Sequence, residues 1–283
     1  MERVGSIEEV RQAVLAARRE GKRIALVPTM GALHAGHLSL VDAACKRADY
    51  VVVSIFVNPT QFGPGEDFAA YPRDLERDFD LLRSEGADLV FTPSVDAMYA
   101  ADAQVTVAPG PLGDVFEGEI RPGHFSGVCT VVAKLFGIVQ PDLAFFGEKD
   151  FQQLAIVKRM VCDLDLPVRI VACPIVRVPD GLALSSRNVY LSAGERHAAT
   201  VLYRALRTAE TLALGGETDA ALLAEAMRAC IAEEPLATLD YAAVIDPATL
   251  RTLDVLAGPA RALVAVRLGE TRLIDNMPLS TGA

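Results

Sequence analysis

The stretch IALVPTMGALHAGHLSLVDAACKRADYVVVSIFVN, residues 24 to 58, contains the pattern that decides the fold. It begins with a short apolar run at 24–27 and ends with a continuous β-branched run at 50–58, which is typical of a strand buried on both faces. Between the two runs, apolar residues recur at a helical spacing from Gly36 onward. A strand, a helix and a second strand in this order predict two parallel strands joined by a crossover helix.

The same alternation extends over the first 175 residues. Ser6 and Glu9 form a capping-box pattern before a first helix, and the charged N-terminal stretch 1–12 is predicted to be helical. Further helices are predicted at 73–86, 125–140 and 150–164, and further strands at 88–93, 142–147 and 168–173. This order is typical of an α/β fold with a doubly wound, Rossmann-like parallel sheet, in which ligands bind beyond the carboxyl ends of the strands.

The character of the sequence changes after Pro174. A turn-rich segment leads into two helical segments at 192–214 and 219–234, and short strands follow at 239–247, 261–269 and 271–276. We therefore predict two domains, a Rossmann-like domain over residues 1–175 and a second, smaller α+β domain over residues 176–283.

Composition narrows the class of protein. With 283 residues, 51% of them hydrophobic, the chain is globular, and its net charge of −10 argues against a general affinity for nucleic acid or anionic membranes. No apolar run approaches the roughly 20 residues of a membrane helix. The N-terminus lacks the apolar core of a signal peptide, and the five cysteines form no C-x-x-C pair. We expect reduced thiols and a cytoplasmic protein without a nucleic-acid or membrane partner.

His34 and His37, two of only four histidines, lie between the first predicted strand and its helix. Unpaired N–H groups at a helix N-terminus suit phosphate, and Gly31 and Gly36 let the backbone approach a ligand. A phosphate site is therefore the favoured interpretation. A metal site would need a third ligand, and the H-x-x-H spacing differs from the i, i+4 spacing of H-E-x-x-H. The other alternative is a pair of helix-start histidines with structural hydrogen bonds.

The segment His34-Ala35-Gly36-His37 resembles the H-x-G-H signature of the nucleotidyltransferase superfamily, and PTMGALHAGHLSL at 28–40 resembles the pantothenate synthetase (pantoate–β-alanine ligase) family more closely. Five further blocks resemble the same family in the same order: VNPTQF at 57–62, YPRDLERD at 71–78, RPGHFSGVCTVV at 121–132, FFGEKDFQQL at 145–154 and LALSSRN at 182–188. The resemblance implies an enzyme that condenses pantoate with β-alanine through a pantoyl adenylate. ATP is consumed, with Mg²⁺ as the cofactor that accompanies it, and AMP and pyrophosphate are released.

The resemblance also implies which residues bind ATP: Met30, Gly31, Ala32, Leu33, His34, Ala35, Gly36, His37, Gly147, Glu148, Lys149, Asp150, Val176, Leu184, Ser185, Ser186 and Arg187. Among them, His37, His34 and Lys149 are the implied catalytic residues. The two histidines would donate hydrogen bonds to developing negative charge, and Lys149 would place a point charge on phosphate. The serines and the arginine of the last block would grip the β- and γ-phosphates in a mobile loop.

Amide side chains provide the implied pantoate pocket. Gln61 and Gln153 match the pantoate ligands of the family, and Asn58 belongs to the same pocket or to its support. Arg121 would reach the pantoate or β-alanine region. The bland alternative for each glutamine is a hydrogen-bonded polar group of the core.

Asp78 is the candidate outer partner of Mg²⁺, an ion that should be held mainly by ATP oxygens and water. Family members often carry adjacent acids here, whereas Arg77 precedes Asp78 in this chain, and this departure weakens the case for a dedicated metal ligand. His124 and His197 are expected to be structural.

Three other functions remain compatible with the fold. One is a nucleotidyltransferase with a different product, which leaves Gln61 and Gln153 without a role. Another is a non-catalytic ATP or AMP sensor, which would have no need of His37 and Lys149 together. The third is a metal-dependent hydrolase, which needs more ligands near the histidines than the sequence offers. The resemblance favours the ligase and also implies a homodimer built through the first domain.

Overall fold

The computed structural model describes residues 1–281, which form two compact units. The first unit contains Met1–Glu148 and Gln152–Pro174, and the second contains Lys149–Phe151 and the chain from Ile175 onward. The predicted boundary at 175/176 lies one residue beyond the junction at Pro174. Nothing in the sequence pattern indicates that residues 149–151 pack with the second unit.

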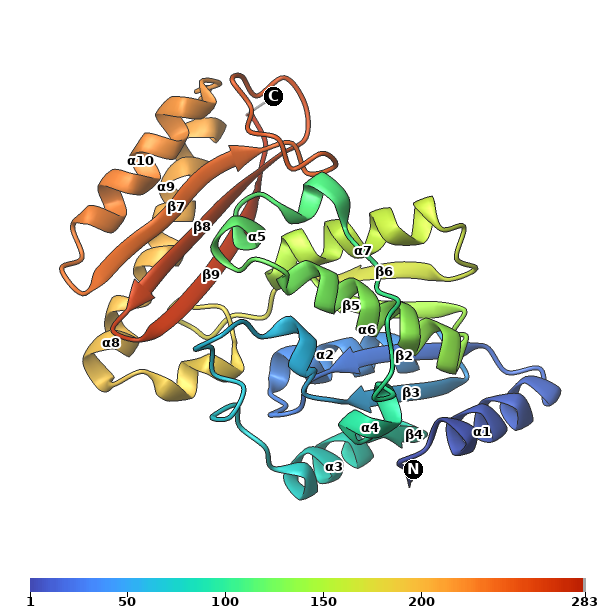
Figure 1. Ribbon diagram of the computed structural model, residues 1–283. Helices are drawn as coiled ribbons and strands as arrows, with labels where there is room; N and C mark the ends of the chain where they lie inside the picture. The colour runs from blue at the N-terminus through green and yellow to red at the C-terminus, as the bar shows by residue number, and fades with distance from the viewer. Residues whose placement is uncertain (282–283) are drawn as a thin grey trace. The chain divides into compact units, whose positions relative to one another are not determined.

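The first unit is built on a six-stranded sheet in the order β1-β4-β3-β2-β5-β6, and every pair of neighbours is parallel (Figure 1). The strands are β1 (Glu2–Val4), β2 (Ile24–Thr29), β3 (Tyr50–Ile55), β4 (Leu89–Phe91), β5 (Leu143–Gly147) and β6 (Arg169–Cys173). The chain builds outward from β2 to β4 and then returns to the other side of β2 for β5 and β6. The order reverses between β2 and β5, and in such sheets the crevice at this point is where ligands bind. The predicted doubly wound α/β sheet is confirmed.

Both faces of this sheet are covered because strand residues alternate between them. Ile24 and Leu26 of β2 belong to one core, and Ala25 and Val27 belong to the other. The first core includes side chains of α1 (Ile7–Arg19), α6 (His124–Val139) and α7 (Phe151–Asp163), and the second includes those of α2 (Ala35–Cys45) and α3 (Leu75–Ser84). Short elements complete the unit: α4 (Val95–Met98), α5 (Glu117–Ile120), η1 (Pro59–Gln61) and η2 (Gly110–Gly113). The turn η3 (Glu148–Asp150) begins in this unit and continues into the second.

The N-terminus departs from its prediction. Residues 2–4 form β1 beside β4, with Glu2 opposite Leu89, and not the predicted helix. The reason is that Ser6 adopts an extended conformation and caps α1, so that the helix begins only at Ile7. The predicted capping box with Glu9 is confirmed. Strand β3 also ends earlier than its apolar run, at Ile55, because Asn58 caps the 3₁₀ turn η1.

The second unit is the α+β structure that the sequence predicts. Antiparallel strands β7 (Ala237–Ile245), β8 (Ala260–Leu268) and β9 (Thr271–Leu279) form its sheet, and α9 (Val201–Leu214) and α10 (Ala220–Ala232) pack against it (Figure 1). The helix predicted at 192–214 is divided into α8 (Ala193–Ala198) and α9, because the Thr200 hydroxyl donates to the His197 carbonyl where the helix would continue. Within residues 1–281, no helix combines the length and the apolar character needed to span a membrane.

Candidate active site

The turn after β2 has a strained backbone that is held by one carboxylate. Gly31 and Ala32 adopt positive φ angles of 83° and 51° in succession. A Cβ at Gly31 would lie 3.0 Å from the Ile55 side chain, so glycine meets a steric as well as a conformational need. Asp78 of α3 accepts hydrogen bonds from the backbone N–H groups of Ala32 and Leu33, each at 2.8 Å. These two bonds secure the unusual turn.

Asp78 is 1% exposed, and its environment sets its chemistry. Burial raises the pKa of its carboxyl, and the hydrogen bonds from the Leu33 and Ala32 N–H groups oppose that rise without cancelling it. Both carboxylate oxygens already accept from the turn. This geometry does not favour the magnesium role predicted for Asp78 and indicates instead a residue that positions the loop.

His34 and His37 both lie at the start of α2. His34 is the N-cap, and its Nδ1 accepts from the Gly36 N–H at 3.1 Å. Since Nδ1 accepts, the proton of the neutral ring lies on Nε2, which is the donor that a phosphate oxygen would need. The two rings are adjacent, with centroids 4.1 Å apart. The structural hydrogen bond and the phosphate role are therefore compatible in the same residue.

No group of three or more His, Cys, Asp or Glu side chains within residues 1–281 is placed to hold a metal ion. The third ligand that a metal site at His34 and His37 would require is thus not among the described residues.

The G-E-K-D segment begins at the end of β5, the strand that pairs with β2. Ala25 lies opposite Leu143 and Leu26 opposite Ala144, so Gly147 ends the strand next to the one that leads to the histidines. Glu148, Lys149 and Asp150 then form the short turn η3.

Lys149 belongs to the second unit through its backbone. Its carbonyl accepts from the Asn276 amide of β9 at 2.9 Å, and its ammonium lies 3.5 Å from Asp150 Oδ1. Two residues further on, Phe151 lies under the Arg261 guanidinium, which is 3.9 Å from the ring centroid. Strands β8 and β9 therefore position the segment that carries this lysine.

Asn58 and Gln61 form a buried amide pair at η1. The Asn58 amide donates to Gln61 Oε1 at 3.1 Å and to the Gly127 carbonyl at 3.2 Å, and its oxygen accepts from the Tyr99 hydroxyl at 2.8 Å. Asn58 is 1% exposed, which suits a support. Gln61 directs its Nε2 to Met30 Sδ at 3.1 Å, which brings it beside the turn after β2.

Two neighbouring glutamines at the start of α7 have opposite environments. Gln152 is buried, accepts from the Glu117 N–H at 3.1 Å, and donates to the carbonyls of Leu112 and Val115. Gln153 is half-buried, and no side-chain hydrogen bond joins it to another residue within 1–281. The predicted ligand is therefore the glutamine whose amide remains available, and Gln152 is the core polar group.

In the second unit, the residues predicted to bind ATP lie on or directly after one hairpin. The Leu184 N–H donates to the Val176 carbonyl at 3.0 Å, so these two predicted ATP contacts are paired across the hairpin. Ser185 then caps η4 (Ser186–Tyr190), where its hydroxyl accepts from the Arg187 N–H at 3.3 Å. Ser185, Ser186 and Arg187 thus begin a short helical turn, in which serine also acts as a cap.

Comparisons with known proteins agree with these features. Residues 2–278 match the family described as pantoate-beta-alanine ligase. The chain belongs to this ligase family. A pantothenate synthetase of Rubrobacter xylanophilus is 55% identical over 282 residues, which is 97% of each chain, and one of Moorella thermoacetica is 52% identical over 99% of each chain.

Solved structures of the pantoate–β-alanine ligase family share the fold. The pantothenate synthetase of Thermus thermophilus superposes with a TM-score of 0.94 at 50% identity, covering 98% of this chain and 99% of that one. The Francisella tularensis pantoate-beta-alanine ligase, in complex with β,γ-ATP and β-alanine, superposes with a TM-score of 0.81 at 34% identity over 98% and 97% of the two chains.

Arg121, placed near pantoate or β-alanine by the family resemblance, is engaged with protein groups. Its guanidinium makes a two-pronged ion pair with Glu66, at 2.8 and 2.6 Å, and also donates to the Gln61 carbonyl at 3.3 Å. Burial alone would raise the pKa of Glu66, but the hydrogen bond and charge of Arg121 outweigh it and lower that pKa. In this conformation Arg121 supports the backbone of Gln61.

His124 also contacts the Gln61 backbone that Arg121 supports, which agrees with the structural role expected for this histidine. Its Nδ1 lies 2.8 Å from the Gln61 carbonyl and its Nε2 lies 3.1 Å from the Arg121 guanidinium. Because a carbonyl only accepts and a guanidinium only donates, the neutral ring carries its proton on Nδ1. Burial, followed by the charge of Arg121, lowers the pKa of His124 to about 4.

This lowered pKa predicts a pH-dependent stability. Below about pH 6.5 His124 is protonated in the unfolded chain, whereas in the folded chain it is protonated only below about pH 4. The free energy of unfolding should therefore fall by up to about 1.4 kcal/mol per pH unit through that window, and the contribution is fully present above it. In His124→Asn the side-chain amide replaces the ring as donor to the Gln61 carbonyl, and position 124 no longer titrates. Between pH 7 and pH 4.5, the free energy of unfolding measured with urea should fall by about 2 kcal/mol more for the natural protein than for the variant. An equal pH dependence of the two proteins would contradict the assignment.

Three functional supports escaped sequence reasoning, namely Glu66, Tyr99 and Gln152. Tyr99 bonds to a partner 41 residues away, and Glu66 to one 55 residues away. Neither spacing leaves a local signal. The adjacent pair at 152 and 153 did carry a signal, because consecutive helical residues lie about 100° apart and face different surroundings.

Proposed function

We propose that the protein catalyses the ATP-dependent condensation of pantoate with β-alanine to pantothenate, through a pantoyl adenylate, with release of AMP and pyrophosphate. The observation that carries this proposal is a strand–turn–helix geometry suited to phosphate, in a chain that matches the ligase family over residues 2–278. The left-handed turn at Gly31 and Ala32 and the two histidines at the start of α2 follow β2, at the point where the strand order reverses. The Francisella relative carries β,γ-ATP and β-alanine, which supports the choice of substrates.

In the first step, a pantoate carboxylate oxygen attacks the α-phosphorus of ATP. A new P–O bond forms as the bond to the bridging oxygen breaks, and pyrophosphate leaves with that electron pair. The positive end of the α2 dipole, together with the His34 and His37 rings, stabilises the negative charge that develops on the phosphates. Lys149 adds a point charge, and Ser185, Ser186 and Arg187 hold the departing phosphates.

In the second step, the β-alanine amine attacks the acyl carbon of the adenylate. The C–N bond forms, the C–O bond to AMP breaks, and the amine loses a proton. An adenylate is required because a free carboxylate would have to expel oxide. The protein's task is therefore to position the reactants and keep water from the adenylate.

The acid-binding residues fall into ligands and supports. Gln153 and Gln61 supply amides for the hydroxyl and carboxylate groups of pantoate, while Asn58 and Arg121 hold Gln61 in place. Met30 lies against Gln61 and adds an apolar surface for the gem-dimethyl group.

The two neighbouring glutamines predict a clear separation of effects. Gln153→Ala should raise KM for pantoate about 10- to 100-fold, the worth of one or two lost hydrogen bonds, and leave thermal stability unchanged. Gln152→Ala is the matched variant. It removes the three hydrogen bonds that the Gln152 amide makes with the backbone of Glu117, Leu112 and Val115, so it should lower the melting temperature by several degrees. The reverse pattern in steady-state kinetics and calorimetry would assign the ligand role to Gln152.

Magnesium enters this proposal with ATP, as part of the substrate. Asp78 gives both its oxygens to the turn after β2, so the phosphate oxygens and water provide the coordination. Kinetics at fixed MgATP should show no further requirement for free Mg²⁺; a strong one would indicate a protein-bound ion.

A homodimer and a cytosolic location are also proposed. Val105 is 90% exposed in the first unit, the part of the chain through which the family resemblance implies dimerisation, and its burial in a partner would remove that apolar surface from water. Light scattering should give a mass of twice the 30.2 kDa of one chain, and a mass of 30.2 kDa would contradict the proposed dimer.

The five cysteines are thiols, which suits the reducing cytosol. Localisation of a tagged protein tests this.

Product release tests the function directly. AMP and pyrophosphate are measured with ATP, Mg²⁺ and pantoate, with and without β-alanine. Steady AMP and pantothenate formation only when β-alanine is present supports the ligase. Turnover that does not need pantoate would indicate a nucleotidyltransferase with another product, and ATP binding without any turnover would indicate a sensor.

A further inference from the structure

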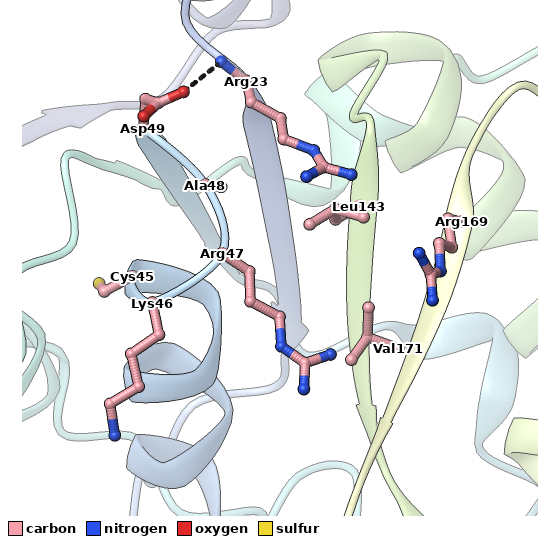
Figure 2. Close-up of a pocket in the computed structure, with 9 residues that line it drawn as sticks. All are labelled: Arg23, Cys45, Lys46, Arg47, Ala48, Asp49, Leu143, Arg169 and Val171. Atoms are coloured by element: carbon pink, nitrogen blue, oxygen red, sulfur yellow. Dashed lines mark hydrogen bonds between the residues drawn. The ribbon is translucent and has the colours of Figure 1, made fainter.

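The sheet of the first unit carries a second pocket at its amino edge. Parallel strands place their amino ends at the edge opposite to the turn that carries His34 and His37. A pocket of about 530 Å³ opens there, between the C-terminal end of α2 and the starts of β2, β5 and β6 (Figure 2). None of the residues implied to bind ATP, pantoate or β-alanine lines it.

Three guanidinium groups surround an apolar floor in this pocket. Figure 2 shows the side chains of Arg23, Arg47 and Arg169 directed around Leu143 and Val171. The three come from separate parts of the chain, namely the residue before β2, the turn after α2 and the start of β6. Convergence of separate segments makes the cluster a property of the fold, not of a basic run in the sequence.

These three arginines have no anionic partner of their own. Within residues 1–281, no side-chain hydrogen bond or ion pair joins Arg23, Arg47 or Arg169 to another residue. Other arginines of the protein are paired, such as Arg121 with Glu66 and Arg177 with Asp275. In a chain of net charge −10, three converging guanidinium groups that are not paired with a carboxylate form a local field that attracts anions.

The other charged residues of the pocket leave its positive field on one side, the side of the three arginines. Lys46 is paired with Asp42 at 2.6 Å and points away from the floor, and Asp49 accepts from the Arg23 backbone N–H at 3.0 Å (Figure 2). Cys45 lies on the other flank, where burial and then the nearby charges of Asp88, Asp42 and Glu85 raise the pKa of its thiol. The flank over Leu143 and Val171 is therefore the cationic one.

We propose that this pocket is a second, non-catalytic binding site for a small polyanion that carries two linked phosphate groups. A guanidinium presents paired N–H donors that match two phosphate oxygens, and three such groups can engage both phosphates of one ligand. Leu143 and Val171 carry no charge that competes for the ligand, so a ligand over this floor is held by the three guanidinium groups. The proposal does not depend on the proposed catalytic function.

Inorganic pyrophosphate is the probe, titrated calorimetrically into the full-length protein at 150 mM salt. Arg47→Gln/Arg169→Gln removes two of the guanidinium groups, both on exposed residues. The matched control is Arg11→Gln/Arg19→Gln, which makes the same change of net charge on exposed positions of α1. We expect a pyrophosphate site that weakens at least 10-fold in the first variant and persists in the control. The kcat and the KM values for ATP and pantoate should remain within about 2-fold, since the site lies apart from the catalytic residues.

The possible outcomes each decide the proposal. Unchanged pyrophosphate stoichiometry and affinity in Arg47→Gln/Arg169→Gln would overturn it, and so would an equal loss in both double variants, which would show a general charge effect. A single site that disappears with Arg47 and Arg169 would support it and would leave the catalytic site without measurable pyrophosphate affinity. Malonate is titrated in the same way, and if it binds as tightly as pyrophosphate, the site does not select phosphate.

Discussion

His37→Ala should lower kcat for adenylate formation about 100- to 1,000-fold, the range observed when one donor to a developing anion is removed. The His37 ring lies in the first turn of α2, next to that of His34, with centroids 4.1 Å apart. At this position both the helix N-terminus and the ring stabilise negative charge on the phosphates. Because the charge grows as pyrophosphate departs, the loss should appear in kcat more than in KM for ATP.

Single-turnover formation of pantoyl adenylate measures this step without interference from the amine reaction. His197→Ala is the matched control, since this histidine is exposed on α8 of the second unit, and its kinetics should stay within about 2-fold of the natural protein. A purely structural role for His37 predicts a lowered melting temperature with nearly normal kcat in the folded fraction. That result would favour the interpretation of His34 and His37 as ordinary helix-start residues.

Asp78→Asn should damage both stability and ATP use, because one carboxylate holds the turn on which the phosphate site depends. The amide keeps one acceptor oxygen, so only one of the N–H groups of Ala32 and Leu33 can remain bonded, and the NH₂ group opposes the other donor. We expect the free energy of unfolding to fall by about 2 kcal/mol. A displaced turn should reduce kcat/KM for ATP about 10- to 100-fold.

The same variant separates the positioning role from a metal role. A positioning residue lowers stability when neither ATP nor Mg²⁺ is present, whereas a metal ligand mainly raises the Mg²⁺ concentration required for activity. Urea unfolding of the ligand-free protein, together with Mg²⁺ titration of activity, distinguishes the two. Asp74→Asn is the control, because asparagine is an equally good helix cap and should retain the hydrogen bond from the Arg77 N–H. Normal stability in Asp78→Asn with a shifted Mg²⁺ requirement would reject the positioning role.

Much of the fold follows from short-range patterns in the sequence. The alternation of strand and helix, the capping box at Ser6 and Glu9, and the change of character after Pro174 each depend on residues within one element or turn. Burial that repeats every two or 3.6 residues is a local property, so it can be recognised without knowing what packs opposite. The predictions were wrong at the ends of elements. Residues 2–4, for example, pair with β4 as the edge strand β1, whereas the sequence predicts a helix there.

The candidate site follows from the sequence only in part. The position of His34 and His37 after a strand and before a helix indicated phosphate chemistry, and the fold places them after β2, beside the reversal in strand order. Which side chains act as supports was hidden. Asp78 reaches a turn 45 residues away, and Asn58 bonds to a carbonyl 69 residues away. Residues at such separations meet only when the whole sheet and its helices are assembled.

The sequence by itself determined the class of fold, the order of its elements and the family's chemistry, because periodicity and contiguous motifs express themselves over a few residues. Only the tertiary structure decided that Gln153 and not Gln152 keeps its amide available, and that Asp78 holds a left-handed turn. It alone brought Arg23, Arg47 and Arg169 to one apolar floor. The physical reason is the same in each case: a hydrogen bond or a local field depends on distances between atoms, and those distances are set by packing between segments far apart in the chain.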